Sequence, residues 1–294
     1  MGLAVIVNKN GGTASKMGDK LESTLQDAFA AAGVEADVQA LDGGEVGDAI
    51  TEAAKRGRVV VAGGDGTAAC AAQQLAGGDA ELGLLPLGTL NHLARDLGLP
   101  DKLEDAAKVA ATGKATAIDV AEVNGHVFVN NASIGLYPLM VRTREGVQDS
   151  KGWPKWLSTI PAAWAALERF PHHRLRVDLG QGERAIVTPL LFIGNNDYSL
   201  DAGALGQRES LTDGKLSVYA VAHRSRASLL WFAARALVGR ARRGADFVAI
   251  GECETLTVSA TGDSIEIALD GEVQRLETPL EFRIRAGALK VVTG

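Results

Sequence analysis

Glycine, aspartate and threonine follow an apolar run in the stretch Val59-Val60-Val61-Ala62-Gly63-Gly64-Asp65-Gly66-Thr67. The β-branched run predicts a buried strand and the small residues after Thr67 predict a helix, so the glycines form a tight loop between them. A loop without Cβ atoms lets a ligand lie against its backbone, and the first N–H groups of a helix favour anions. The stretch therefore predicts a phosphate site, although an ordinary strand-to-helix turn can have the same composition.

Two further polar turns follow predicted strands in the same half of the chain. Asn8-Lys9-Asn10-Gly11-Gly12 follows the strand Leu3–Val7, and Gly88-Thr89-Leu90-Asn91-His92 follows an apolar run that begins at Leu82. Strands that alternate with helices form parallel sheets, and ligands bind beyond the carboxyl ends of such strands. The turns could therefore face one ligand together. The alternative for the last turn is turn chemistry with a helix N-cap.

Phosphate-binding turns would suit phosphoryl transfer, among other reactions of phosphates, and this reaction needs a held nucleotide, a divalent cation and a base for the acceptor hydroxyl. Backbone N–H groups of Gly64, Gly66 and Thr67, with those of 10–12, would hold the phosphates. Asp65 would hold Mg²⁺ through water or orient its loop, since this hard cation prefers oxygen ligands. Thr89 and Asn91 would contact the nucleotide.

A pair of carboxylates lies near the end of the chain, in Asp270-Gly271-Glu272 after the apolar strand Ile265–Leu269. Two carboxylates on either side of a glycine can aim at one point in a bent loop and act as a general base. The alternative is a plain hairpin turn, which Asp-Gly commonly forms. Spacing alone favours the hairpin turn.

Composition restricts the class of protein. The chain has 294 residues with 30 Lys and Arg against 36 Asp and Glu, a net charge of −6 that argues against general nucleic-acid binding. Cys70 and Cys253 form no Cys-x-x-Cys motif, so we expect two reduced, buried thiols in a cytoplasmic protein. Residues 1–7 lack a basic region and a cleavage site, and we expect no membrane-spanning segment.

The first part of the chain alternates between strand and helix patterns. Predicted helices at Lys16–Ala32 and Val46–Arg56 separate the strands Leu3–Val7 and Val34–Leu41 from the strand that enters Gly63. After Val120, strands dominate. The predicted strands there are Ala121–Val129, Arg174–Leu179, Ile186–Ile193, Leu216–Val221, Thr255–Ser259, Ile265–Leu269 and Leu280–Arg285. Turns such as Asn124-Gly125 favour antiparallel pairing.

Two stretches interrupt the strand pattern and contain every tryptophan of the chain. Trp153, Trp156 and Trp164 lie in a predicted helix, and Trp231 lies among the basic residues of Arg224–Arg243. A basic amphipathic helix with aromatic rings suits an anionic membrane surface. The alternative is a helix that packs its apolar face on the fold and exposes a basic face to water.

The order of these motifs resembles the diacylglycerol-kinase catalytic-domain family, which includes bacterial lipid kinases and the sphingosine and ceramide kinases. The resemblance rests on five segments. They are residues 8–12, Gly63–Thr67 with Pro86–Arg95, Phe128–Gly135, Leu211–Leu216 and Asp270–Glu272. The resemblance extends along nearly the whole chain.

The resemblance implies two domains. Residues 1–119 would form a nucleotide-binding α/β domain with a parallel sheet in a Rossmann-like, three-layer arrangement, to which the last strand, within residues 286–294, returns. Residues 120–285 would form a β-sandwich with inserted helices that accepts the lipid.

The resemblance also assigns roles to residues. Glu272 would take the proton of the acceptor hydroxyl with Asp270 as its supporting partner, and Asp213 would bind a structural Mg²⁺ with the carbonyls of Ser210 and Lys215. A turn aspartate is the alternative for Asp213. The expected nucleotide-binding residues are Asn8, Asn10, Gly11, Gly12, Gly63, Gly64, Asp65, Gly66, Thr67, Thr89 and Asn91.

Three features depart from the family pattern. Lys9 replaces the usual proline of the first loop, and Ala40-Leu41 stands where a threonine often follows the second strand. Residues 201–208 lack the usual glycine run and proline–alanine pair. The departures at Ala40-Leu41 and at residues 201–208 bear on the metal site and on the acceptor more than on the nucleotide.

The expected function is an ATP-dependent lipid kinase that phosphorylates a hydroxyl of a neutral lipid, with diacylglycerol first and ceramide or a sphingoid base next. It would work in the cytoplasm or peripherally on the inner face of the membrane, using ATP and Mg²⁺ in phospholipid synthesis. Alternatives are an NAD-kinase-like enzyme, although no Asn-Glu pair of that kind is present, and a nucleotide- or lipid-binding regulator without turnover. A homodimer is left open.

Overall fold

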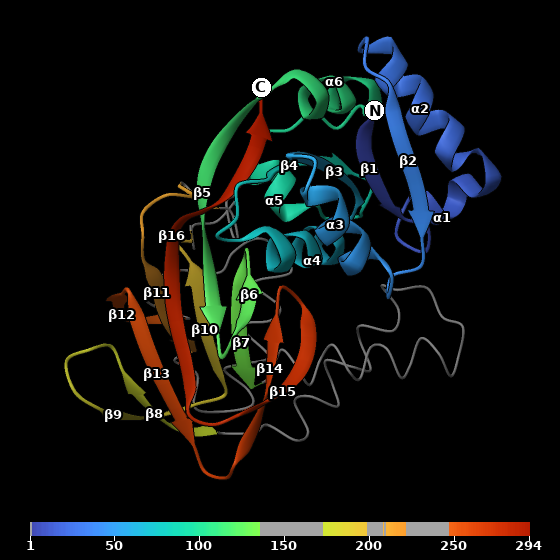
Figure 1. The fold of residues 1–294 in the computed structure, drawn as a ribbon. Coiled ribbons are helices and arrows are strands. Elements are labelled where there is room, and N and C mark those ends of the chain that lie inside the picture. The colour runs from blue at the N-terminus through green and yellow to red at the C-terminus, as the bar shows by residue number, and fades with distance from the viewer. Residues whose placement is uncertain (1, 136–172, 199–207, 209, 222–246) are drawn as a thin grey trace, which may run out of the picture. The chain divides into compact units, whose positions relative to one another are not determined.

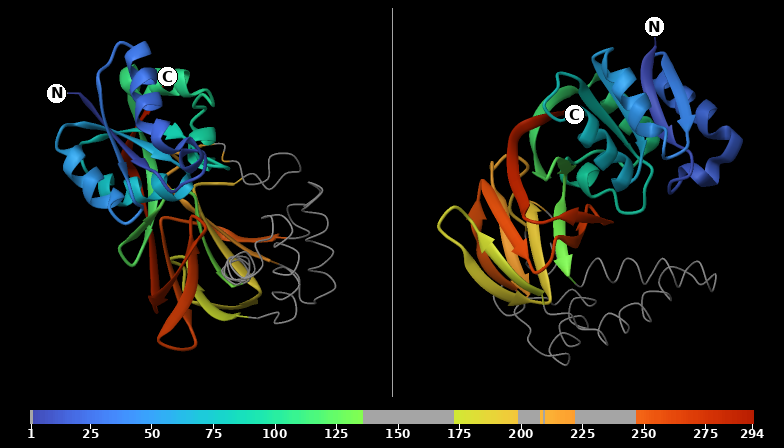
Figure 2. Two further views of the ribbon diagram at one scale, coloured as in Figure 1. Left: turned by 90° about the vertical axis from the view of Figure 1, so that its right-hand side faces the viewer. Right: turned by 60° about the horizontal axis from the view of Figure 1, so that its bottom comes forward.

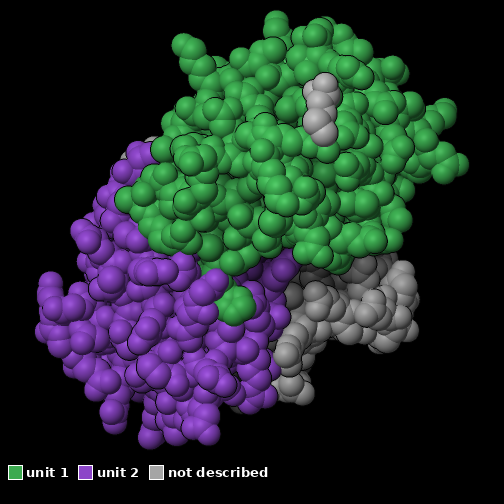
Figure 3. Space-filling model, in the orientation of Figure 1, with its two compact units in different colours: residues 1–120, 126–129, 285–294 green, residues 121–125, 130–284 purple. Residues whose placement is uncertain are grey.

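The computed structural model describes residues 2–135, 173–198, 208, 210–221 and 247–294 (Figure 1). Two compact units share these residues, coloured separately in Figure 3. Unit 1 comprises Met1–Val120, His126–Val129 and Arg285–Gly294, and unit 2 comprises Ala121–Gly125 and Asn130–Ile284. The long strands β5 (Lys114–Val123) and β16 (Leu280–Thr293) each contribute to both units.

Unit 1 is built on a parallel sheet. Its strands, in spatial order, are β2 (Ala36–Leu41), β1 (Leu3–Asn8), β3 (Arg58–Gly63) and β4 (Glu81–Pro86). The end of β16 joins this sheet beside β4, where Lys290 pairs in parallel with Glu81. The helices are α1 (Ala14–Met17), η1 (Gly18–Lys20), α2 (Leu21–Ala31), α3 (Val46–Ala54), α4 (Asp65–Leu75), α5 (His92–Asp96) and α6 (Leu103–Thr112). The short strand β6 (His126–Phe128) pairs with β5.

Helices cover both faces of the unit 1 sheet (Figures 1 and 2). On one face, α2 and α6 pack against alternate residues of β1 and β3 in a core that includes Val5, Phe29 and Val60. On the other face, α3 and α4 contact each other and β3. Since successive strand residues point to opposite faces, burial on both sides explains why β1 and β3 are apolar throughout.

The helix that the sequence predicts over Lys16–Ala32 is wrong in its first turn. Gly18 has a φ of 54°, which an α-helix does not allow, so the chain ends α1 there and begins α2 at Leu21. The remainder keeps the expected apolar stripe, with Leu21, Leu25 and Phe29 buried.

Unit 2 is antiparallel. Its six-stranded sheet has the order β12 (Phe247–Cys253), β11 (Leu216–Val221), β10 (Leu190–Asn195), β7 (Asn131–Gly135), β14 (Ser264–Leu269) and β15 (Glu272–Glu277). The start of β16 pairs with β13 (Thr255–Ala260), which is followed by β8 (His173–Asp178) and β9 (Arg184–Thr188). The buried residues of its core include Ile193, Val218 and Phe282. The predicted class, a parallel α/β part followed by a β-sandwich, is confirmed.

The sequence interpretation missed some strand boundaries in unit 2. The strand predicted at Ile186–Ile193 is two strands, β9 and β10, which meet at Pro189, a residue without a backbone donor for the ladder. Strands β12 and β15 were not predicted from the sequence. The tryptophan-containing segments and Arg224–Arg243 lie outside the described residues. Within the described residues, the structure contains no helix long and apolar enough to cross a membrane.

Candidate functional site

The first glycine-containing turn, residues 8–12, packs against the loop that follows β4. The backbone N–H of Thr13 donates to the carbonyl of Leu87 at 2.8 Å. Gly12 has a φ of 47°, and a Cβ at this position would overlap the Leu87 carbonyl oxygen. Glycine is therefore required here both by the left-handed backbone and by the close approach of the second loop.

The Gly63–Thr67 loop packs against the same segment. The N–H of Leu87 donates to the carbonyl of Gly63 at 2.9 Å, and a Cβ on Gly64 would lie 3.1 Å from the Cα of Gly88. The backbones of Gly64 and Gly88 are thus in direct contact. Three loops that are far apart in sequence, at 8–12, 63–67 and 86–91, meet at the carboxyl edge of the parallel strands of unit 1.

Asp65 joins two of these loops through its carboxylate. Its Oδ1 accepts the N–H of His92 at 2.6 Å and its Oδ2 accepts the N–H of Asn91 at 3.0 Å, so it caps the start of α5. Of the two roles predicted for Asp65, the contacts correspond to orienting the loop. Asn91, at a φ of 50°, accepts the N–H of Gly88 with its Oδ1 at 2.9 Å and also structures the loop. Thr89 is exposed.

The start of α4 provides backbone donors at this edge. Its first turn is closed by the bond from the N–H of Ala68 to the carbonyl of Gly64 at 3.0 Å. The preceding N–H groups of Asp65, Gly66 and Thr67 have no partner within the helix, as at every helix N-terminus. A small pocket lies behind them, with Val61 and Leu84 in its wall. Free N–H groups together with the helix dipole favour an anion such as a phosphate.

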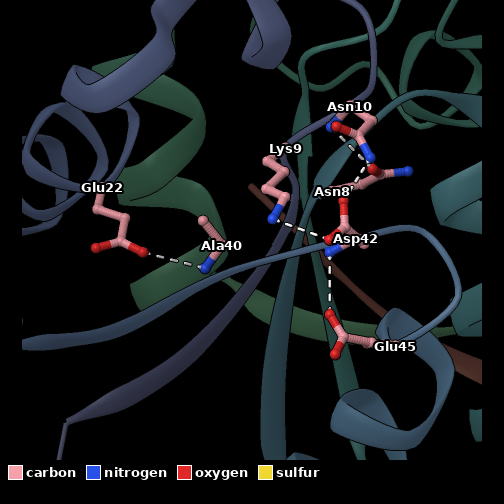
Figure 4. A network of polar contacts seen from close by, with 7 residues as sticks. All are labelled: Asn8, Lys9, Asn10, Glu22, Ala40, Asp42 and Glu45. Atoms are coloured by element: carbon pink, nitrogen blue, oxygen red, sulfur yellow. Dashed lines mark hydrogen bonds and ion pairs between the residues drawn. The ribbon is translucent and has the colours of Figure 1, made fainter.

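A residue that the sequence interpretation missed, Asp42, completes the edge at the end of β2 (Figure 4). Its carboxylate accepts the side-chain N–H of Asn10 at 2.7 Å and pairs with the ammonium of Lys9 at 3.0 Å. The backbone N–H of Asn10 donates to Oδ1 of Asn8 at 3.1 Å. The pKa of Asp42 is lowered, first by the hydrogen bond from Lys9 and then by that from Asn10. Its place directly after a strand, before Gly43, was the available signal.

The Asp270-Gly271-Glu272 segment forms the hairpin turn between β14 and β15. Asp270 and Gly271 have φ values of 47° and 91°, and Leu269 pairs with Glu272 across the turn. Oδ1 of Asp270 accepts the N–H groups of Asn130 and Asn131 at 2.7 and 3.1 Å, which fixes the turn to the start of β7. Glu272 is exposed. The hairpin alternative is therefore the geometry found, and it leaves one carboxylate bonded and the other open to solvent.

The expected metal-binding segment, Ser210 to Lys215, is a surface turn of unit 2. Asp213 is exposed, and the Lys215 carbonyl accepts the N–H of Asn196 at 2.9 Å, which leaves that oxygen one lone pair. The Lys215 ammonium pairs with Glu252 at 2.9 Å. That hydrogen bond raises the pKa of Lys215, with the charges of Glu252, Asp213 and Asp197 adding to it. One carboxylate with two carbonyls is a donor set of the kind Mg²⁺ accepts. Within the described part of the chain, no three His, Cys, Asp or Glu side chains gather closely enough to hold a metal ion.

Residues 2–123 match the family model described as diacylglycerol kinase catalytic domain, which confirms the resemblance inferred from the motifs in this part of the chain. Among curated proteins, the chain is 43% identical over 108 residues to a protein of Cronobacter sakazakii named Probable lipid kinase YegS-like, covering 34% of this chain and 36% of that protein. A Pectobacterium atrosepticum protein of the same name is 31% identical over 179 residues, 56% of each chain. The chain thus spans from about a third to somewhat over half of the length of these relatives.

Among solved structures, the fold is similar to that of a diacylglycerol kinase from Bacillus anthracis str. Sterne. The TM-score is 0.70 at 19% sequence identity, and the alignment covers 100% of this chain and 97% of the other. At this identity the likeness concerns the fold alone.

Proposed function

We propose that this protein is an ATP-dependent lipid kinase, which transfers the γ-phosphate of ATP to a hydroxyl of a neutral lipid such as diacylglycerol. The observation that carries the proposal is the meeting of the loops 8–12, 63–67 and 86–91 around the N-terminus of α4. A phosphate chain needs such a set of backbone donors. The family match over residues 2–123 and the names of the curated relatives support a lipid as the acceptor.

Glu272 is the proposed proton acceptor. Its exposed carboxylate stands at the end of a hairpin that Asp270 fixes through two backbone hydrogen bonds, so the base is held by a rigid turn. The acceptor oxygen would attack the γ-phosphorus while the bond to the β-phosphate breaks, its proton would pass to Glu272, and ADP would leave. Mg²⁺ would accompany the nucleotide and neutralise phosphate charge, and Asp213 with the carbonyls of Ser210 and Lys215 is the proposed site of a structural ion.

The acceptor must come from a bilayer, so we place the enzyme in the cytoplasm at the inner membrane face. The chemistry that supports this location is in the sequence, where Trp231 lies among the arginines of Arg224–Arg243 and the other three tryptophans lie together within residues 153–164. Liposome flotation with and without anionic lipid tests it. Binding that requires anionic lipid is the expected result.

The kinase proposal is tested with radiolabelled ATP, Mg²⁺ and a panel of lipids in mixed micelles. The expected result is a labelled phospholipid from diacylglycerol, and its loss in Glu272→Gln. The matched control is Glu277→Gln, an exposed glutamate at the other end of the same strand, which should retain activity.

Other outcomes of this assay lead to different functions. Labelled product only from ceramide or a sphingoid base keeps the kinase and changes the acceptor. Transfer to NAD makes the protein a small-molecule kinase. Binding of ATP without transfer to any acceptor, equal in the wild type and in Glu272→Gln, makes it a regulator and contradicts the proposal.

A further inference from the structure

The first loop of unit 1 carries a cation at the carboxyl edge of the parallel sheet. Lys9 lies within the turn 8–12, and its ammonium is 3.0 Å from Oδ2 of Asp42 (Figure 4). Both side chains are open to water, with 46% of Lys9 and 56% of Asp42 exposed. Oδ1 of the same carboxylate accepts from Asn10 at 2.7 Å. One acidic group thus holds two consecutive residues of the loop.

A negatively charged side chain at this edge of the sheet would disfavour the binding of an anion. The carboxyl edge of the sheet presents the N-terminus of α4, whose free N–H groups and dipole favour negative ligands. The charge of Asp42 would oppose such a ligand unless a cation cancels it. Lys9 is that cation, since its ammonium pairs with the Asp42 carboxylate.

We propose that Lys9 is a phosphate-binding residue whose ammonium rests on Asp42 and turns to the polyphosphate chain of the nucleotide when that ligand binds. The inference rests on the proposed function and deepens it, because it names the residue that sets affinity for the phosphate chain. Asp42 is a positioning residue that acts through Lys9.

The exposure of the pair makes the exchange feasible. Ion pairs between exposed side chains are weak and are screened by salt, so the pair gives way readily to a more highly charged anion. A lysine binds phosphate as a point charge on a flexible stem and tolerates a range of positions.

The loop itself need not move for the ammonium to turn. The N–H of Lys9 donates to the carbonyl of Leu41 at 3.0 Å, and the N–H of Asn10 donates to Asn8 at 3.1 Å. The backbone on both sides of the Lys9 side chain is therefore held by β2 and by the preceding asparagine. Only the side-chain torsions change between the two partners.

The test measures equilibrium binding of ATP and of inorganic tripolyphosphate to the full chain by calorimetry. Lys9→Met should weaken both ligands about fivefold or more, and Lys9→Arg should restore most of the affinity because the charge returns. Asp42→Asn should tighten both about two- to fivefold, because its oxygen can still accept from Asn10 while the ammonium of Lys9 is released.

Opposite changes in affinity for Lys9→Met and Asp42→Asn would exclude a merely structural role of the ion pair. Both substitutions break the same ion pair, so a merely structural clamp predicts weaker binding for Lys9→Met and Asp42→Asn alike. The matched controls are Lys55→Met and Glu52→Gln, which break an exposed ion pair at the far end of α3 and should leave binding unchanged.

Two results would overturn the inference. The first leaves the proposed nucleotide site standing, and the second does not. If the wild type binds both ligands but the two variants shift in the same direction or not at all, Lys9 has no such role and the nucleotide site stands. If the wild type binds neither ligand, the kinase proposal and the role of Lys9 fall together.

Discussion

The carboxylate of Asp65 is bonded to the backbone of His92, with 2.6 Å between Oδ1 and the amide nitrogen. The first residue of α4 thereby holds the first residue of α5, and the second carboxylate oxygen holds Asn91. This contact couples the loop after β3 to the loop after β4. The shape of the candidate phosphate site therefore depends on a side chain that is engaged with protein backbone.

Replacing Asp65 tests this coupling. Asp65→Asn offers only one acceptor oxygen to two backbone donors, so we expect the free energy of unfolding to fall by about 1–3 kcal/mol. Urea denaturation followed by circular dichroism measures it. Asp101→Asn, in an exposed turn, is the control and should change stability by less than about 0.5 kcal/mol. Equal midpoints for the two variants would show that the Asp65 contacts do not support the fold.

The contact between Gly64 and Gly88 gives a second prediction. A Cβ at Gly88 would overlap the Cα of Gly64, which is backbone and cannot swing aside. Gly88→Ala should destabilise the protein by about 1–3 kcal/mol through overpacking and should weaken ATP binding, because the loops must separate. At Gly44 the added methyl group meets nothing within 4 Å, so Gly44→Ala is the matched control. Thermal unfolding with and without ATP measures both effects. Equal melting temperatures and equal shifts by ATP for Gly88→Ala and Gly44→Ala would contradict the prediction.

Substitutions at the two acidic residues of the hairpin should have different effects, one on stability and the other on activity. Asp270→Ala removes the acceptor of two backbone N–H groups and a side chain that tolerates a φ of 47°, so we expect a loss of about 1–3 kcal/mol in unfolding free energy. Glu272→Gln changes an exposed side chain and should leave stability within about 0.5 kcal/mol while removing lipid phosphorylation. Denaturation curves and the radiolabel assay on the same preparations give both readouts. A destabilised Glu272→Gln variant would contradict this division of roles.

The thiol of Cys253 should be slow to react. Partial burial raises its pKa from 9.0 to about 11, so the thiolate fraction near pH 8 falls about a hundredfold below that of the unfolded chain. Labelling by a chromogenic disulfide in a Cys70→Ala background should therefore accelerate about tenfold per pH unit between pH 8 and 10. Unfolding should also become easier as pH rises from about 9 to 11, because only the unfolded state ionises there.

The prediction is contradicted if Cys253 reacts as fast in the native protein as in urea. Neither cysteine forms a disulfide in the structure and neither is fully buried, which corrects the expectation of two buried thiols. Cys253 ends β12, a strand that the sequence pattern did not predict.

The sequence alone determined the features that arise from local patterns. An apolar run, a glycine loop and a small-residue helix follow one another at Val59–Leu75, and this order holds in any fold that buries the strand. The alternation of strands and helices also indicated that the turns at 8–12, 63–67 and 86–91 share one edge, because parallel strands end together. The family resemblance rested on the same local motifs.

Tertiary structure alone decided what these side chains bind. Asp65 accepts a hydrogen bond from His92, which lies 27 residues further along the chain. Asn10 donates one to Asp42, at a separation of 32 residues. No periodicity connects such positions, since their proximity depends on strand order and on how each loop leaves the sheet. The same reason explains why the bonds of Asp42, the contact of Gly88 with Gly64 and the bonds of Asp270 to the start of β7 became evident only when the chain was folded. A hydrogen bond requires two groups within about 3 Å, and only packing sets that distance.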